Sequence, residues 1–100
     1  MGTEIHHPGE TVPCRVRWLK HDTDALYTPD QSTTITIYYK DGTAQVTDQA
    51  MTELSIGIMY YNWASAADDE LGDYYFVAVG TDGTGTGETI QFCYGSFRLT

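Results

Sequence analysis

The strongest constraint on the fold comes from residues 54–63, where the side chains alternate after Gly57. Successive side chains of an extended strand point to opposite faces, so this alternation predicts a β-strand. One face carries the larger apolar groups, namely Met59, Tyr61 and Trp63. The other face carries Ile58, Tyr60 and Asn62. We therefore expect a strand that places Trp63 in the core as its largest residue.

The same pattern returns in residues 72–79, where a glycine again precedes alternating apolar side chains. Tyr74, Phe76 and Ala78 are predicted to point inward, and the residues between them outward. An acidic segment, residues 65–71, joins this stretch to the first one. We expect the two stretches to form neighbouring antiparallel strands.

Composition and charge support an all-β domain and exclude some classes of partner. Threonine, tyrosine, valine, isoleucine and glycine dominate, which is typical of strands. The 100 residues carry 14 acidic and five basic side chains, giving a formal net charge of -9. Phosphate backbones repel such a surface, so we expect no nucleic-acid partner. No apolar run reaches transmembrane length, and we expect no membrane partner.

About seven short strands follow from the spacing of alternating segments and turn signals. They are expected at residues 11–20, 32–40, 43–47, 51–56, 58–64, 73–79 and 88–99. Asp41-Gly42 is a strong hairpin signal, and Pro13 places the strand 11–20 at a sheet edge or delays its pairing. This pattern is typical of an immunoglobulin-like β-sandwich, although the cysteine-tryptophan-cysteine spacing of antibody domains is absent. We expect the domain in residues 11–100 and an N-terminal arm in residues 1–10.

Two local irregularities are also predicted. Residues 48–50 are expected to form a turn or a single helical turn. Gly95 interrupts the alternation of the last strand and is predicted to mark a β-bulge. Such a bulge would bring two sets of apolar residues to the same face, one before it and one after it: Ile90, Phe92 and Tyr94, then Phe97 and Leu99.

Residues with metal-ligating side chains occur in three places: His6-His7, His21 with Asp22 and Asp24, and Asp82 with Glu88 beside the glycine-rich loop 80–87. Adjacent side chains of a strand diverge, so the histidine pair cannot chelate an ion. The second group has too few ligands for zinc or calcium. The third lacks the alternate acids of a calcium loop and the lysine and helix of a phosphate loop. We therefore predict no metal and no cofactor.

Catalytic residues are not indicated either. Three serines, Ser55, Ser65 and Ser96, lack a nucleophile-elbow motif, and neither cysteine has a recognisable histidine partner. The carboxylates of residues 68–70 lie in a hydrophilic segment without a pocket to raise a pKa. The chain is therefore expected not to be an enzyme.

Two cysteines, Cys14 and Cys93, lie in the first and last predicted strands. The N-terminus is polar and does not resemble a secretory signal, so we expect synthesis in the cytoplasm. Free thiols are typical of that compartment. A disulfide between the two cysteines is the alternative if the terminal strands are adjacent.

The strongest functional indication is the apolar character of strand faces that should contact water. A lone sandwich normally carries polar residues there, so these faces are covered either by a loop or by another protein. Aromatic enrichment with few charges is typical of interface cores and favours a protein partner. A small basic stripe on the first strand could pair with an acidic partner. The predicted interface residues are Arg15, Arg17, Tyr38, Ile58, Tyr60, Tyr75, Val77 and Val79.

A recurrent prokaryotic module shows a similar combination of motifs. They are Pro8-Gly9-Glu10-Thr11-Val12, Asp41-Gly42, Met51 ahead of Gly57, Gly57-Ile58-Met59-Tyr60-Tyr61-Asn62-Trp63 and Gly72-Asp73-Tyr74-Tyr75-Phe76-Val77-Ala78-Val79. Over about residues 8–99 the chain resembles the small immunoglobulin-like and macroglobulin-like domains of bacterial and archaeal surface proteins. It also resembles stand-alone structural proteins of tailed phages, although Met59 stands where an aromatic residue is usual.

A chain that begins at Met1 and stops at Thr100 favours the phage type of this resemblance. What the resemblance then implies is a virion structural protein, either a capsid decoration protein or a head or tail accessory protein. Its expected partners are copies of itself and other virion proteins. The alternative is a carbohydrate-binding or adhesion module that binds glycans through exposed tryptophan and tyrosine.

Overall fold

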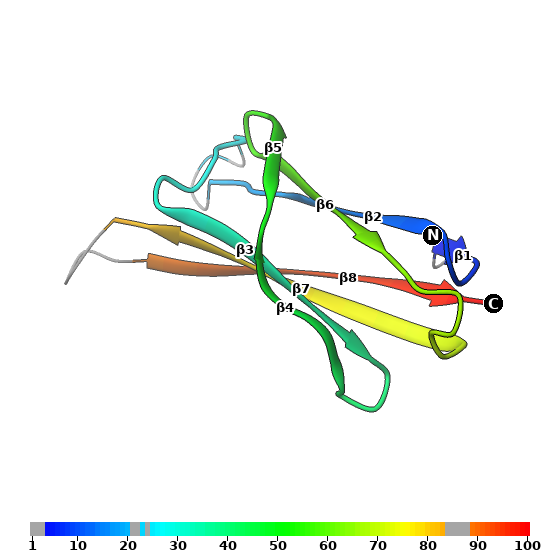
Figure 1. Cartoon of the computed structure of the whole chain (residues 1–100). Helices are drawn as coiled ribbons and strands as arrows, with labels where there is room; N and C mark the ends of the chain where they lie inside the picture. Colours follow the sequence, from blue (N-terminus) through cyan, green and yellow to red (C-terminus); the bar gives the residue numbers. More distant parts are fainter. Residues whose placement is uncertain (1–3, 21–22, 24, 84–88) are drawn as a thin grey trace.

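The protein is an all-β structure in which two sheets pack against each other (Figure 1). This computed structural model describes residues 4–20, 23, 25–83 and 89–100. Within them the chain forms eight strands and no helix. The strands are β1 (Glu4–His6), β2 (Thr11–Arg17), β3 (Ser32–Tyr39), β4 (Ala44–Ala50), β5 (Thr52–Ser55), β6 (Ile58–Ala64), β7 (Gly72–Asp82) and β8 (Thr89–Leu99).

The larger sheet has five strands in the order β1-β8-β7-β3-β4, and the smaller has three in the order β2-β6-β5. Neighbouring strands are antiparallel except for β1, which runs parallel to β8. The chain passes from β4 in one sheet to β5 in the other almost without interruption, with the buried Met51 between them (Figure 1). The predicted β-sandwich is therefore confirmed at the level of its two packed sheets.

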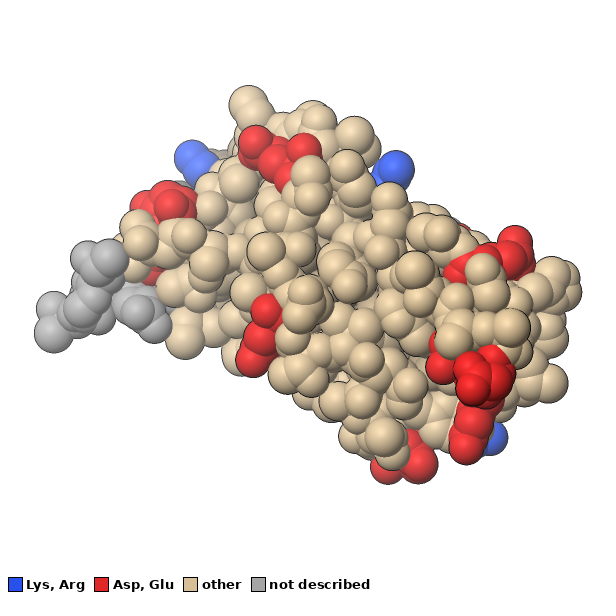
Figure 2. Space-filling model, viewed as in Figure 1, with Lys and Arg blue, Asp and Glu red and all other residues tan. Residues whose placement is uncertain are grey.

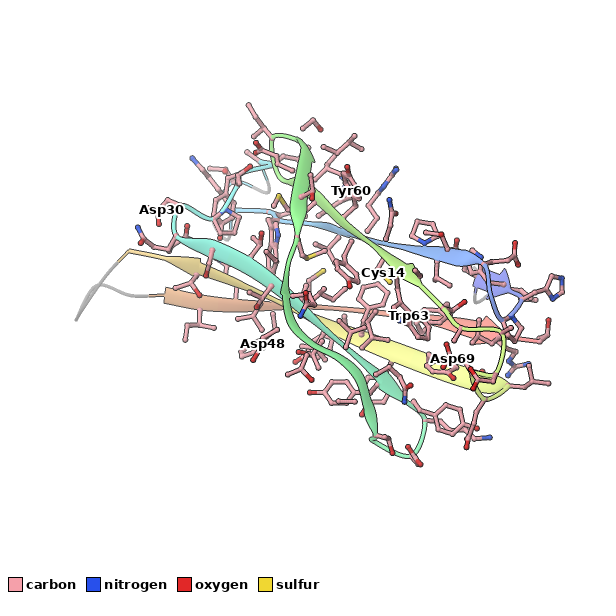
Figure 3. The ribbon with its side chains drawn as sticks, viewed as in Figure 1. Cys14, Asp30, Asp48, Tyr60, Trp63 and Asp69 are labelled. Carbon is pink, nitrogen blue, oxygen red and sulfur yellow. The ribbon has the colours of Figure 1, made fainter. Side chains whose placement is uncertain are left out.

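Alternation in β2, β3, β6 and β7 supplies the core, as predicted. The buried hydrophobic residues of these strands are Val12, Cys14, Val16, Ile35, Ile37, Tyr39, Met59, Trp63, Tyr74, Phe76 and Ala78. Figure 3 shows Cys14 and Trp63 between the two sheets and Tyr60 on the outer side of β6. β2 is an edge strand, which accommodates the missing N–H of Pro13.

An aromatic cluster occupies one end of the core. The ring of Trp63 from the small sheet lies 5.5 Å from that of Tyr74 and 5.7 Å from that of Phe97, both from the large sheet. Tyr74 and Phe97 face each other across β7 and β8, with ring centroids 5.3 Å apart. The cluster therefore joins the two sheets through side chains alone.

One predicted pairing is wrong. The strands at 58–64 and 73–79 were expected to be antiparallel neighbours, but β6 and β7 belong to different sheets. β6 pairs with β2 and β5, while β7 pairs with β3 and β8. The segment 65–71 crosses from one sheet to the other, because Trp63 and Tyr74 must meet across the core.

The predicted bulge at Gly95 is also wrong. The register of β7 with β8 runs without a shift from Gly72 opposite Leu99 to Asp82 opposite Thr89. Gly95 lies opposite Phe76, and a Cβ atom at this position would be 2.1 Å from Cζ of the Phe76 ring. The glycine therefore makes room for a core side chain. Because the alternation is unbroken, Phe97 and Leu99 are buried and the apolar residues before Gly95 face outward.

The expected turn at residues 48–50 is part of a strand. β4 continues to Ala50 and pairs with β3 through two register shifts. At this irregularity Asp48 adopts a left-handed backbone conformation with a φ of 47°. Its backbone N–H donates a hydrogen bond to Oγ1 of Thr36 at 3.1 Å. The Asp41-Gly42 hairpin between β3 and β4 is present as predicted, with a φ of 91° at Gly42.

Residues 4–10 form structure that the sequence did not predict. β1 pairs with β8, and the amide of Thr100 donates to the carbonyl oxygen of His6 at 3.0 Å. Further along, Oγ of Ser65 accepts from the amide of Gly9 at 3.0 Å and donates to the carbonyl of Glu10 at 2.6 Å. β1 therefore covers the edge of β8 that does not pair with β7.

Candidate protein-binding face

The eight predicted interface residues lie on two outer faces that point away from each other. Half of them lie on the outer side of the large sheet, namely Tyr38, Tyr75, Val77 and Val79. The other half lie on the outer side of the small sheet, namely Arg15, Arg17, Ile58 and Tyr60. They therefore cannot form one continuous contact, and each face is considered separately.

The outer side of the large sheet carries a continuous apolar surface, which we call the apolar face. It comprises Tyr38, Tyr75, Val77, Val79, Ile90, Phe92 and Tyr94. The β7–β8 register places Val77 opposite Tyr94 and Val79 opposite Phe92. Cross-strand partners on one side of a sheet are in direct contact, so these side chains form rows across the strands. On the β3 side, the rings of Tyr38 and Tyr75 stack with centroids 5.0 Å apart.

Sequence reasoning missed the most exposed part of this face. Ile90, Phe92 and Tyr94 were expected to share one face with Phe97 and Leu99 through the bulge and were not among the predicted interface residues. Their exposed fractions are 51%, 57% and 71%. With Tyr75 at 38%, and roughly 200 Å² for a fully exposed aromatic residue, the four leave about 400 Å² of mainly apolar surface. A typical monomer's largest apolar patch is roughly 300–600 Å² and is often functional. These four residues of the apolar face are therefore comparable in area to the largest apolar patch of a typical monomer.

One end of the apolar face is charged and hollowed. Nε of Arg98 donates to Oδ1 of Asp73 at 2.7 Å, and this hydrogen bond holds the pKa of the Asp73 carboxyl below its usual range. Beside the pair lies a hollow of about 300 Å³ lined by Lys40, Tyr75, Ser96 and neighbouring residues. Ser96, which lines the hollow, follows the exposed Tyr94 by two residues in β8.

The sheet edges are poor sites for adding a further strand. β1 has three residues and β5 has four, which offer few backbone groups. β2 carries Pro13, and β4 is distorted by two register shifts and by Asp48. Short, bulged or proline-containing edges are typical of strands that do not pair with other chains. The described strands therefore favour contact through a face over contact through an edge.

The outer side of the small sheet is smaller and more polar. Arg15 lies opposite Tyr60 and Arg17 opposite Ile58 in the β2–β6 register. Pro13, Arg15, Leu54, Tyr60 and Asn62 line a shallow hollow of about 220 Å³. The phenol, guanidinium and amide groups of this hollow provide one aromatic ring beside several hydrogen-bonding groups.

Acidic side chains line another hollow at the end of the molecule where Asp69 lies (Figures 2 and 3). It is formed by Tyr39, Asp41, Thr43, Gln45, Asp68, Asp69, Glu70 and Tyr74. Both tyrosine hydroxyls already donate to backbone carbonyls, Tyr39 to Leu71 at 3.0 Å and Tyr74 to Glu70 at 2.7 Å. Among the described residues, no three His, Cys, Asp or Glu side chains are grouped as metal ligands.

Asp82, considered above as a cation ligand, fixes a loop within the described part of the chain. Its Oδ2 accepts a hydrogen bond from the Tyr27 hydroxyl at 3.0 Å, and its Oδ1 accepts one from the amide of Asp30 at 2.8 Å. Burial, followed by the bond to Asp82, raises the pKa of Tyr27 to about 12. His6 and His7 contact different groups: Nε2 of His6 lies 2.7 Å from Oε1 of Glu4, and Nδ1 of His7 lies 2.8 Å from the carbonyl oxygen of Thr100. The remaining candidate ligands lie outside the described residues: His21, Asp22, Asp24 and Glu88.

Cys14 and Cys93 are both free thiols. Cys14 is fully buried, and its Sγ lies 3.9 Å from the carbonyl oxygen of Val12. Burial, followed by the negative charge of Glu4, raises the pKa of the Cys14 thiol from 9.0 to about 12. The thiol is therefore a neutral core group, consistent with the free thiols expected from the sequence.

The raised pKa of Cys14 predicts a loss of stability at alkaline pH. Between pH 9 and pH 12 the unfolded state loses the thiol proton while the folded state keeps it, so the free energy of unfolding falls as the pH rises. Below pH 9 the contribution is fully present. Chemical denaturation should show a downward slope between pH 9 and pH 10 that is reduced in Cys14→Ala, while the raised pKa values of Tyr27 and Tyr74 keep part of the slope. An equal slope in both proteins would contradict the assignment.

Comparison with protein families, with curated proteins and with solved structures found no match for this chain. The described residues also contain no helix with the length and hydropathy needed to span a membrane.

Proposed function

We propose that the chain is an immunoglobulin-like domain with a structural, non-enzymatic role that binds other proteins through its apolar face. The strand order supports the fold proposal. Immunoglobulin domains combine a sheet that contains strands B, E and D with a sheet of strands C, F and G, to which variable-type domains add C′. The orders β2-β6-β5 and β8-β7-β3-β4 correspond to B-E-D and G-F-C-C′. The core tryptophan and cysteines do not follow the antibody pattern.

Tyr74 gives independent support for the same fold. Immunoglobulin-like domains often carry a tyrosine corner, in which a tyrosine near the start of strand F bonds to backbone a few residues upstream. Tyr74 lies near the start of β7, and its hydroxyl donates to the carbonyl of Glu70 at 2.7 Å. Burial raises the pKa of Tyr74 to about 12, so this hydroxyl keeps its proton.

Removal of the Tyr74 hydroxyl should destabilise the domain measurably. In Tyr74→Phe the ring keeps its packing but the hydrogen bond to Glu70 is lost, which typically costs about 1 kcal/mol. A domain of this size then melts about 4–8 °C lower. Tyr75→Phe is the matched control, because its ring is on the outer face and its hydroxyl has no hydrogen bond to the described residues. Thermal unfolding should separate the variants, and equal melting temperatures would contradict the tyrosine corner.

The observation that carries the functional proposal is the exposure of Ile90, Phe92 and Tyr94 in a row beside Val77 and Val79. When another protein covers large apolar side chains gathered on one face, their removal from water favours binding. The contribution is about 25 cal/mol per Å² of apolar surface buried. Aromatic residues of this kind dominate binding energy at interfaces. The role is passive, since contact alone holds the partners together.

The resemblance stated above supports a virion setting for this role, as a capsid decoration protein or a head or tail accessory protein. The proposed partners are copies of the chain itself and other virion proteins. Of the eight residues first singled out, Tyr38, Tyr75, Val77 and Val79 belong to the proposed surface. Arg15, Arg17, Ile58 and Tyr60 lie on the opposite side and are proposed as a secondary contact.

Site-specific photo-crosslinking tests the proposal directly. A photo-reactive benzoylphenylalanine in place of Phe92 should yield a defined protein adduct on illumination of the assembled particle or cell. The same group in place of Ile56, which is 70% exposed on the β5–β6 turn, is the control. Mass spectrometry then identifies the adduct and distinguishes a second copy from a foreign protein. No adduct at position 92, or equal adducts at both positions, would overturn the proposal.

A second candidate function is glycan binding by the outer side of the small sheet. The observation that favours it is the hollow in which the ring of Tyr60 lies with the polar groups of Arg15 and Asn62. Sugars bind through such combinations of an aromatic face and hydrogen-bonding groups. Glycan binding that is lost in Tyr60→Ala and kept in Tyr94→Ala would establish this function instead. Loss in neither variant would exclude this hollow as the glycan site.

A further inference from the structure

We propose that a second copy of this chain covers the apolar face, packed face to face so that the two β8 strands run in opposite directions about a two-fold axis. This inference rests on the proposed function, because it names the partner of the same face. Two observations favour a second copy: the local charge and the shape along β8. The arrangement that they define also brings cations onto aromatic rings.

Charge distinguishes this face from the rest of the molecule. The chain carries a formal net charge of -9, and Figure 2 shows acidic groups on several parts of the visible surface. Like charges disfavour the approach of a second copy there. The outer side of the large sheet instead balances two anions, Asp48 and Asp73, with two cations, Lys40 and Arg98. The charges of the described residues on this side sum to zero, so the two facing surfaces add no like-charge repulsion of their own.

Shape is complementary along β8 when the strands are antiparallel. The ring of Tyr94, exposed to 71%, stands beside the hollow that Tyr75 and Ser96 help to line. Positions 94 and 96 are separated by about 7 Å along the strand. If the two-fold axis passes close to position 95, Tyr94 of each copy faces Ser96 of the other. Each copy then contributes one protruding ring and one hollow, which is the self-complementarity that a two-fold interface requires.

The same arrangement brings opposite chemical groups together beyond the hollow. Arg98 of one copy lies over Phe92 of the other. Lys40 of one copy faces the row of side chains that contains Thr34 and Val79 of the other. A guanidinium over an aromatic ring is favourable, and more so when water is excluded. Asp48 remains at the β4 edge of the contact. No row places two charges of equal sign directly opposite each other.

Exchange of the ring and the hollow tests this geometry. Tyr94→Ser removes the ring, and Ser96→Tyr fills the hollow, so each should weaken self-association of the intact chain at least about tenfold. The double variant Tyr94→Ser/Ser96→Tyr restores both features with their places exchanged, and its dissociation constant should return to within about threefold of the unsubstituted protein. Ile56→Ser is the matched control and should change nothing.

Sedimentation velocity over a range of protein concentrations measures these constants, and circular dichroism confirms that each variant is folded. A defined dimer that responds to the three variants as stated supports the inference. A strict monomer, or a dimer unaffected by Tyr94→Ser, would overturn it, and so would a double variant no tighter than the single ones. A monomer that still gives a foreign adduct from position 92 would leave the proposed function standing; a monomer with no such adduct would overturn both.

Discussion

Replacement of Gly95 by alanine should lower the free energy of unfolding by about 2–3 kcal/mol, the upper part of the range for overpacked cores. The added Cβ would lie 2.1 Å from Cζ and 2.6 Å from Cε1 of Phe76. Real Cβ atoms do not approach other heavy atoms so closely, and the ring lies in a core that has little room to relax. We expect a melting temperature about 10–20 °C lower by differential scanning calorimetry.

A double variant shows whether the Phe76 ring is the cause. Phe76→Leu makes space at the position that the new methyl group needs, so Gly95→Ala should cost clearly less in that background than in the unsubstituted protein. Ser96→Ala, one residue away and pointing outward, is the control and should change stability by less than about 0.5 kcal/mol. A cost for Gly95→Ala that is the same in both backgrounds would show that steric contact with Phe76 is not the reason.

Phe97→Ala should be strongly destabilising, with a loss of about 3–5 kcal/mol. Phe97 is 1% exposed, and its ring contacts both Tyr74 and Trp63 in the aromatic cluster that joins the two sheets. Truncation leaves a cavity that these rigid rings cannot fill. Denaturant unfolding at equilibrium measures the loss, provided that the variant folds in the absence of denaturant.

Phe92→Ala is the matched control for this change, since it removes the same atoms from the same strand. Phe92 is 57% exposed on the outer face, so its truncation should cost less than about 1 kcal/mol when the protein is dilute enough to be monomeric. Equal losses for the two variants would contradict the assignment of opposite faces to positions 92 and 97.

The strands and most of their inward residues could be predicted from alternation, because a period of two is a local property of the chain. Tyr74, Phe76 and Ala78 are buried as predicted. Alternation does not state which sheet a strand joins, and this explains the wrong pairing of β6 with β7. A link as long as residues 65–71 can return within one sheet or cross to the other. The contact of Trp63 with Tyr74, which decides between them, is not local.

The exposed half of the apolar face could not be predicted for a related reason. β8 carries large apolar residues on both of its sides, so its sequence fits either a bulge at Gly95 or an unbroken strand. The choice depends on Phe76, which needs the space above Gly95 and is 19 residues away. The outward residues of β7, by contrast, followed from a regular alternation that Tyr75, Val77 and Val79 share. Their role in an interface stays a prediction.

The pairing of β1 with β8 brings the start of the described chain beside its end: Glu4 lies opposite Phe97, and the amide of Thr100 donates to the carbonyl oxygen of His6. Both ends emerge together at one side of the molecule (Figure 1). A host protein could therefore carry this domain as a guest inserted into one of its surface loops, because entry and exit need span only a small gap. The same proximity allows a circular permutant in which a short linker joins the old ends and the Asp41-Gly42 turn is opened.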